Sequence, residues 1–163
     1  MYERILIPTD GSEAAARAFD HARSLVETYD AELHALYVVD IDSTSFRLGS
    51  ETVERTHDAA LSDLPPYLRG EGSDAFARIE ERVDASGLSV ETHVAVGAPH
   101  REIAHLVDRE GIDLVVMASH GRGGVGRLLL GSVTERTVRT VPVPVLVVDV
   151  RGEATSGSES ETA

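Results

Sequence analysis

The sequence contains no cysteine, no tryptophan and no lysine, and these absences exclude whole classes of chemistry. Without cysteine the chain has no disulfides, thiolate zinc sites, iron–sulfur clusters or cysteine nucleophiles. All 15 basic residues are arginine, so a lysine-dependent phosphate loop and a Schiff-base lysine are excluded too.

Long apolar runs are also absent. No stretch approaches the roughly 20 apolar residues that a membrane span requires. The first residues lack the basic start and the long apolar segment of a signal peptide. We therefore expect a cytoplasmic protein with no membrane partner.

Positive charge is scarce relative to negative charge. The 28 acidic and 15 basic residues give a formal net charge of -13. This charge argues against nucleic acid or anionic membranes as partners. An acid excess without lysine favours a halophilic source, whose salty cytoplasm requires acidic surfaces for solubility. Codon bias with an ordinary acidic surface is the alternative.

A chain of 163 residues has the length of a single domain. We assign residues 1–150 to one α/β domain. Residues 151–163 contain no large apolar side chain and are expected to form a disordered acidic tail.

Short apolar runs alternate with helical patterns along the domain. Strands are expected at 2–9, 33–39, 90–96, 113–118 and 143–150. A helical pattern follows the first strand, and another runs from about residue 52 to Gly87, with breaks at 65–66 and 70–72. Further helices are expected at about 97–111 and 132–140. This alternation predicts an α/β fold, a single doubly wound sandwich with a five-stranded parallel sheet and helices on both faces.

Ligands of such sheets bind beyond the carboxyl ends of the strands, where the winding reverses. That rule directs attention to residues 8–10, 38–40, 96–97 and 119–121. The most informative segment, 118–132, leaves a strand, passes four glycines and enters a helix near Ser132. Glycine backbone amides, the helix start and the cations Arg122 and Arg127 together predict an anion site. A flexible loop with a capping serine remains the alternative.

At these residues the chain resembles the universal stress protein family, whose nucleotide-binding branch carries Gly-x2-Gly-x9-Gly-Ser/Thr after the fourth strand. Gly121, Gly131 and Ser132 match the last three positions, whereas Ala118 stands at the first. The segments Ile-Leu-Ile-Pro-Thr-Asp-Gly-Ser, Gly-Ala-Pro and Val-Pro-Val-Pro-Val-Leu-Val-Val are similar to the family as well. The resemblance covers residues 2–150 and implies the strand order 3-2-1-4-5.

The resemblance also implies a ligand, ATP with or without Mg²⁺, and a role for each matching residue. Asp10 would accept hydrogen bonds from ribose hydroxyls, and the backbone of Val38 would contact the adenine edge. The alternatives are a helix cap at Asp10, plain core at Val38 and a structural hydrogen bond at His120. A methyl group at Ala118 would crowd the ribose or force a small shift of it. The cofactor-binding residues predicted in this way are Pro8, Thr9, Asp10, Val38, Ala118, His120, Gly121, Arg122, Gly131, Ser132 and Val133.

Other site types find weaker support in the sequence. His100 and His105 lie about 140° apart on a helix, unlike a chelating pair, so no metal site is expected. Ser119 lacks the Gly-x-Ser-x-Gly elbow of a hydrolase, and Gly-x-Gly-x-x-Gly is missing after the first strand. No general base is evident, so no catalytic residue is assigned and at most slow ATP turnover is expected.

Two functions remain open. The first is an ATP-binding stress-response or regulatory protein. The second is a dimeric protein-interaction module of the same fold with a vestigial nucleotide pocket. Under both, the resemblance implies a homodimer joined through the last strand, and Val143 to Val150 is an apolar terminal strand whose edge would be exposed.

Overall fold

The computed structural model describes residues 1–41, 56–85, 87–120 and 130–149. The predicted tail at 151–163 lies outside these residues. The described elements, in chain order, are β1 (Arg4–Thr9), α1 (Glu13–Tyr29), β2 (Glu32–Asp40), β3 (Thr56–Ala59), a 3-10 turn (Leu61–Asp63), α2 (Pro66–Asp84), β4 (Val90–Gly97), α3 (Pro99–Glu110), β5 (Leu114–Ala118), α4 (Ser132–Thr140) and β6 (Val145–Val148).

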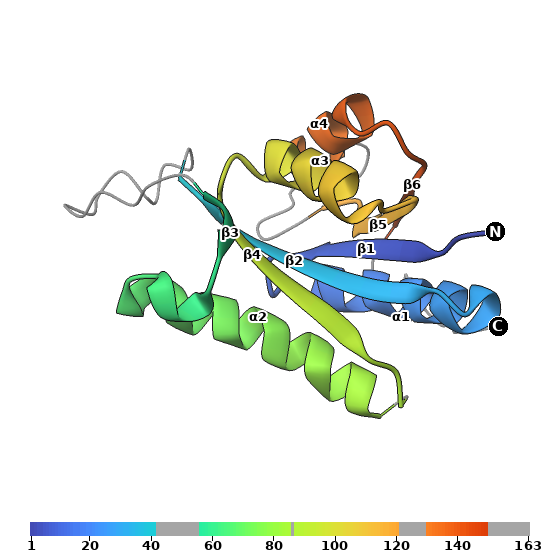
Figure 1. Cartoon of the computed structure of the whole chain (residues 1–163), viewed down its shortest axis with the longest axis horizontal. Coiled ribbons are helices and arrows are strands. Elements are labelled where there is room, and N and C mark those ends of the chain that lie inside the picture. Colours follow the sequence, from blue (N-terminus) through green and yellow to red (C-terminus); the bar gives the residue numbers. More distant parts are fainter. Residues whose placement is uncertain (42–55, 86, 121–129, 150–163) are drawn as a thin grey trace, which may run out of the picture.

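One six-stranded mixed sheet forms the centre of the molecule, with the strand order β3-β4-β2-β1-β5-β6 (Figure 1). The five predicted strands correspond to β1, β2, β4, β5 and β6. They pair in parallel in the order 3-2-1-4-5, so this part of the prediction is confirmed. The prediction of an all-parallel, five-stranded sheet is wrong by one strand, since β3 adds an antiparallel edge.

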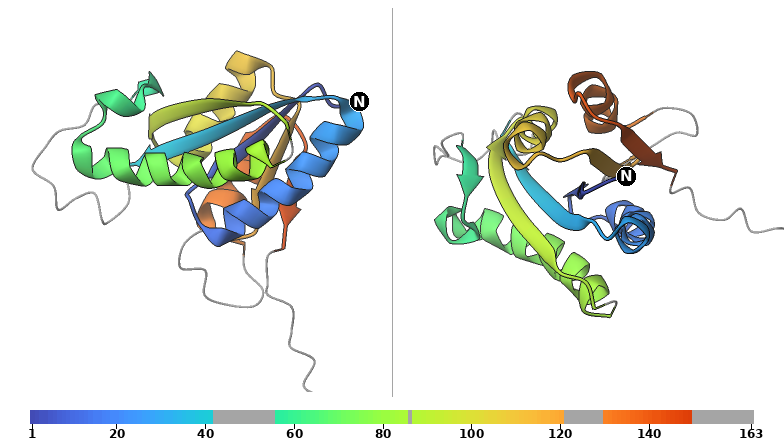
Figure 2. Two further views of the ribbon diagram at one scale, coloured as in Figure 1. Left: turned by 90° about the horizontal axis from the view of Figure 1, so that it is seen from below. Right: turned by 45° about the vertical axis from the view of Figure 1, so that its right-hand side comes forward.

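Two helical layers cover the sheet. Helices α1 and α2 lie on one face, whereas α3 and α4 lie on the other (Figures 1 and 2). Alternation along β1 explains the two cores: Ile5 and Ile7 belong to the cluster under α1 and α2, and Leu6 belongs to the cluster under α3. All three side chains are fully buried, as the continuous apolar run predicts.

The segment from Thr56 to Ala59 was expected to be helical, and this expectation is wrong. These four residues form β3, which pairs with β4 through Thr56 opposite Val96 and Ala59 opposite Val94. Its side chains are exposed or half-buried, so the segment lacks the alternation of apolar and polar residues that would predict a strand. Its structure comes from backbone pairing with the edge of β4, a tertiary effect that local sequence does not encode.

The predicted breaks in the next helix are also wrong. Pro65 is the residue before α2 and Pro66 its first residue, so the two prolines start the helix instead of interrupting it. The helix then continues through Gly70 to Asp84. A glycine inside a helix costs about 1 kcal/mol relative to alanine. Burial of Phe76, Ile79 and other apolar residues of α2 against the sheet offsets that cost.

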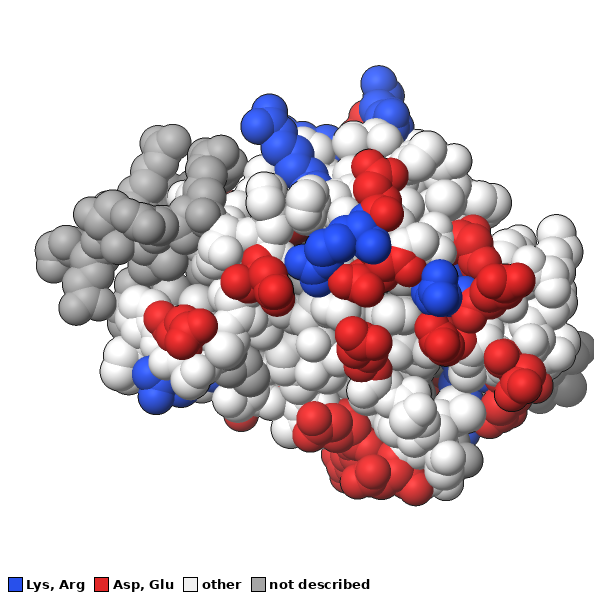
Figure 3. All heavy atoms as spheres, in the orientation of Figure 1, with Lys and Arg blue, Asp and Glu red and all other residues white. Residues whose placement is uncertain are grey.

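The last strand is shorter than expected, Val145–Val148 instead of 143–150, and it borders the sheet at the edge opposite β3. None of the helices in the described part of the chain is long and apolar enough to span a bilayer. Acidic side chains are spread over the face seen in Figure 3, with fewer arginines between them. The negative net charge is therefore displayed on the surface.

Candidate functional site

The reversal of winding falls between β1 and β5. Ile5 of β1 lies opposite Leu114 of β5, and Leu6 lies opposite Val115. Continuing this register by three residues puts Thr9 beside Ala118, at the carboxyl ends of both strands. The sequence rule for doubly wound sheets therefore selects one place, where the chain after β1 meets the chain after β5.

A tight turn follows β1. The buried Thr9 hydroxyl accepts a hydrogen bond from the Gly11 amide at 3.1 Å, and Gly11 has a left-handed φ of 74°. The Asp10 carboxylate accepts from the Ser12 amide at 2.9 Å. Ser12 itself caps α1, because its hydroxyl accepts from the Ala15 amide. Asp10 thus shapes the turn that leads into the helix without being the cap.

The end of β5 is tied to α4 by two hydrogen bonds. The Thr134 hydroxyl donates to the Ala118 carbonyl at 2.9 Å, and the Gly131 amide donates to the Ser119 carbonyl at 2.8 Å. The Ser119 amide in turn donates to Val148 of β6. These bonds fix the first turn of α4 beside the carboxyl end of β5.

Helix α4 has no side-chain cap among the residues that the structure describes. Gly131 is the N-cap residue, with φ of -58°, and no described side chain accepts a hydrogen bond there. Ser132 is the first helical residue and is exposed, so it does not cap the helix. Amides in the first turn of a helix have no intrahelical partner, and they carry the positive end of the helix dipole. Such an uncapped start can bind an anion through the amides of Ser132 and Val133.

The remaining predicted residues lie around this place or outside the described chain. Pro8 is half-buried near the end of β1, and Val38 is half-buried near the end of β2. His120 follows Ser119 and shares a hydrogen bond of 2.8 Å with its hydroxyl. Gly121 and Arg122 fall in 121–129, outside the described residues.

Ala118, the departure from the family motif, is 8% exposed and belongs to the core cluster under α1 and α2. Its methyl group therefore packs in the protein interior. The predicted crowding of a ribose at Ala118 stays a prediction.

A buried carboxylate that the sequence analysis missed lies at the end of β4. Glu102 of α3 is 6% exposed, and its carboxylate is 2.6 Å from Nδ1 of His57 on β3. The carboxylate packs directly on the backbone of Gly97, where a Cβ atom would overlap it. The Gly-Ala-Pro segment marked the place in the sequence, but only the fold brings Glu102 and His57 together.

A family model, curated relatives and solved structures each match most of the chain. The model of the "Universal stress protein family" matches residues 1–149. Universal stress protein MJ0531 from Methanocaldococcus jannaschii is 34% identical over 148 residues, covering 91% of this chain and 82% of that protein.

Two solved structures have folds similar to that of this chain. The structure of hypothetical protein MJ0577 has a TM-score of 0.72 and 32% identity, covering 93% of this chain and 98% of its own. A universal stress protein crystallised in complex with cAMP has a TM-score of 0.64 and 26% identity, covering 90% of this chain and 97% of its own.

Proposed function

The chain belongs to the universal stress protein family, and from that premise we propose that it binds an adenine nucleotide, ATP in the first place, as a regulatory protein. The ligand would lie across the carboxyl ends of β1 and β5. The residues proposed to hold it are Pro8, Thr9, Asp10, Val38, Ala118, His120, Gly121, Arg122, Gly131, Ser132 and Val133.

The start of α4, which no described side chain caps, is the observation that carries the proposal. It offers the Ser132 and Val133 amides, and the Ser132 hydroxyl, beside the end of β5. Nucleotide phosphates are the anions that such a helix start accommodates, and the Asp10 carboxylate after β1 is an acceptor suited to ribose hydroxyls. Mg²⁺ would accompany the phosphates as part of the ligand.

The choice of an adenine base is supported by the relative crystallised with cAMP. The backbone of Val38 is proposed to contact the adenine edge. Melting curves with ATP, AMP, cAMP and GTP test the choice. Saturating adenine nucleotides are expected to raise the melting temperature more than GTP does, and equal shifts for all four would refute an adenine-specific pocket.

Replacing Asp10 by Asn is expected to lower nucleotide affinity about tenfold, or about 1.4 kcal/mol. Asn keeps the side-chain oxygen that accepts from the Ser12 amide, so the turn survives, but it loses the charge that strengthens a bond to ribose hydroxyls. Titration calorimetry measures the affinity. The control is Asp10→Ala, which removes the turn contact as well and should also lower the melting temperature. Equal affinities of Asp10→Asn and wild type would remove Asp10 from the site.

A homodimer through β6 is proposed as the working assembly. Within the described ranges, β6 pairs with β5 alone, and its Leu146 is 39% exposed. Val138 on the neighbouring α4 is exposed as well. An apolar edge strand of this kind favours pairing with a second copy.

Replacing Leu146 by Glu is therefore expected to convert a dimer into a monomer, because a charge would be buried at the pairing edge. Sedimentation equilibrium measures the mass, which should fall to the chain mass of 17.5 kDa. Arg139→Glu, an exposed change on α4, is the control and should stay dimeric. A wild-type chain that is already monomeric would contradict the proposed assembly.

The net charge of the chain supports the proposal that the protein works in a salty cytoplasm. A net charge of -13 without lysine suits a halophilic cytoplasm, in which acidic side chains keep the protein in solution. The same charge disfavours nucleic acid and anionic membranes as partners.

A further inference from the structure

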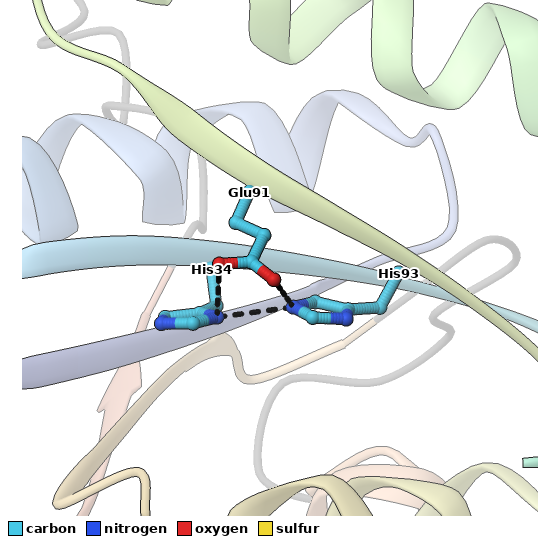
Figure 4. Close-up of side chains that lie close together, drawn as sticks. All are labelled: His34, Glu91 and His93. Atoms are coloured by element: carbon cyan, nitrogen blue, oxygen red, sulfur yellow. Dashed lines mark hydrogen bonds and ion pairs between the residues drawn. The ribbon is translucent and has the colours of Figure 1, made fainter. Parts of the chain in front are cut away.

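A second cluster of chemically competent side chains lies far from the proposed nucleotide site. His34 of β2 and His93 of β4 are both buried, and Nδ1 of His34 is 3.0 Å from Nε2 of His93. The Glu91 carboxylate spans the gap between the two rings, with its oxygens 3.9 Å and 3.8 Å from these nitrogens (Figure 4). Among the described residues, this is the one group of three whose ligand atoms all lie within 4.8 Å of one another.

The hydrogen bonds around the rings define where their protons are. Arg109 donates to Nδ1 of His93 at 3.3 Å, so the neutral His93 ring carries its proton on Nε2 and donates it to His34. The proton of His34 is then on Nε2, which is buried and has no hydrogen-bond partner in the described part of the chain. The protein thus holds a buried polar pair that is incompletely satisfied, which is uncommon unless the group has a further role.

We propose that His34, His93 and Glu91 bind a divalent transition-metal ion of the Zn²⁺ type, through Nδ1, Nε2 and a carboxylate oxygen respectively. Two imidazoles and one carboxylate are a ligand set that zinc accepts, with water completing the coordination. Magnesium prefers oxygen ligands and would not compete for this site.

The distances are close to those of an occupied site. Two nitrogens bound tetrahedrally to zinc lie about 3.3 Å apart, against 3.0 Å here, so the rings must separate by about 0.3 Å and turn until both lone pairs face one ion. The Glu91 side chain is 64% exposed and free to move its carboxylate the remaining few tenths of an ångström. Because Glu91 is exposed, the site has an entry path from solvent.

The charged side chain next to His34 favours metal binding by that ring, whereas the one next to His93 opposes it. Nε2 of His34 faces the Glu32 carboxylate at 3.9 Å, and metal-bound histidines commonly donate their second N–H to a carboxylate. His93 must move its proton to Nδ1, where Arg109 now donates. The charge of Arg109 is partly balanced by its hydrogen bond to Glu110, which lowers the pKa of Glu110 and keeps that carboxylate ionised.

Burial, followed by the neighbouring His34 ring, lowers the pKa of His93. Neutral imidazole is the form that binds metal ions.

The metal site is separate from the nucleotide site. His34 precedes Val38 by four residues on β2, which is about 13 Å along an extended strand. It therefore lies toward the amino ends of the parallel strands, whereas the nucleotide site lies at their carboxyl ends. Failure of either proposal leaves the other standing.

Competition with a chromogenic zinc chelator, on the full chain without a purification tag and without nucleotide, tests the proposal. We expect one Zn²⁺ per chain and a rise in melting temperature when it binds. Glu91→Gln and His93→Gln should each lower the affinity about tenfold or more, and Glu91→Gln changes only an exposed side chain. Arg109→Gln should raise the affinity about tenfold, the lower end of effects seen for groups that contact metal ligands.

The matched control removes a different pair of histidines. His57 and His105 are exposed, and their rings stack at 4.0 Å on the same side of the sheet. The double variant His57→Ala/His105→Ala is expected to keep the zinc affinity of the wild type. The proposal is overturned if zinc binds no better than Mg²⁺, if Glu91→Gln and His93→Gln bind it as the wild type does, or if the loss occurs only in the double variant.

Discussion

Replacing Gly131 by Val is expected to lower nucleotide affinity by at least about 100-fold, or about 2.8 kcal/mol. Gly131 is the N-cap of α4, directly before the amides proposed to bind phosphate. A branched side chain at this position would occupy the space through which an anion approaches the helix start. The Gly131 amide already donates to the Ser119 carbonyl, so the effect is steric and does not depend on losing that donor.

The fold should survive this change. Gly131 has φ of -58° and ψ of 149°, a conformation that valine adopts without strain. The melting temperature of Gly131→Val is expected to fall only slightly, since valine is a poorer N-cap residue than glycine, and titration calorimetry of the folded variant then measures binding. Gly131→Ala is the graded control, with a smaller loss of affinity. Unchanged affinity in Gly131→Val would refute the assignment of phosphate to this helix start.

Replacing Gly97 by Val is expected to destabilise the fold by about 3 kcal/mol. A Cβ atom on Gly97 would overlap the carboxylate of Glu102, which is 6% exposed and would have to leave its buried position. Displacing Glu102 breaks its contact with His57 and weakens the attachment of β3 to the edge of the sheet. Chemical denaturation of both proteins measures the difference in the free energy of unfolding.

The matched control is Gly70→Ala in α2. A Cβ atom there meets nothing within 4 Å, and alanine is the better helix former, so this variant should gain up to about 1 kcal/mol. A lower free energy of unfolding for Gly97→Val, together with a higher one for Gly70→Ala, would support the contact with Glu102 as the cause of the loss at Gly97. If Gly97→Val were as stable as the wild type, the close packing of Glu102 on the β4 backbone would be wrong.

Local patterns predicted the parallel strands and most helices well, because burial on both faces of β1 and β5 leaves a plain apolar signal. Local patterns failed where tertiary contacts determine the secondary structure. Thr56–Ala59 is a strand only because β4 offers a free edge, and α2 continues through Gly70 because its apolar face is buried. Neither effect is visible in a window of neighbouring residues.

The proposed nucleotide site was largely within reach of the sequence, since its residues follow strand ends and a glycine motif. The proposed metal site was not. His34 and His93 are 59 residues apart, and adjacent strands bring them together through a register that no spacing pattern encodes. The same holds for Glu102 and His57, which come from α3 and β3.

Titration calorimetry of the wild-type chain with ATP and Mg²⁺, at molar salt, tests the central claim most directly. We predict saturable binding of one ATP per chain, with AMP and cAMP competing and GTP weaker. A concentration of 100 times the dissociation constant should then stabilise the fold by about 2.7 kcal/mol. Absence of both binding heat and stabilisation with every adenine nucleotide would contradict the account and favour an interaction module with a vestigial pocket.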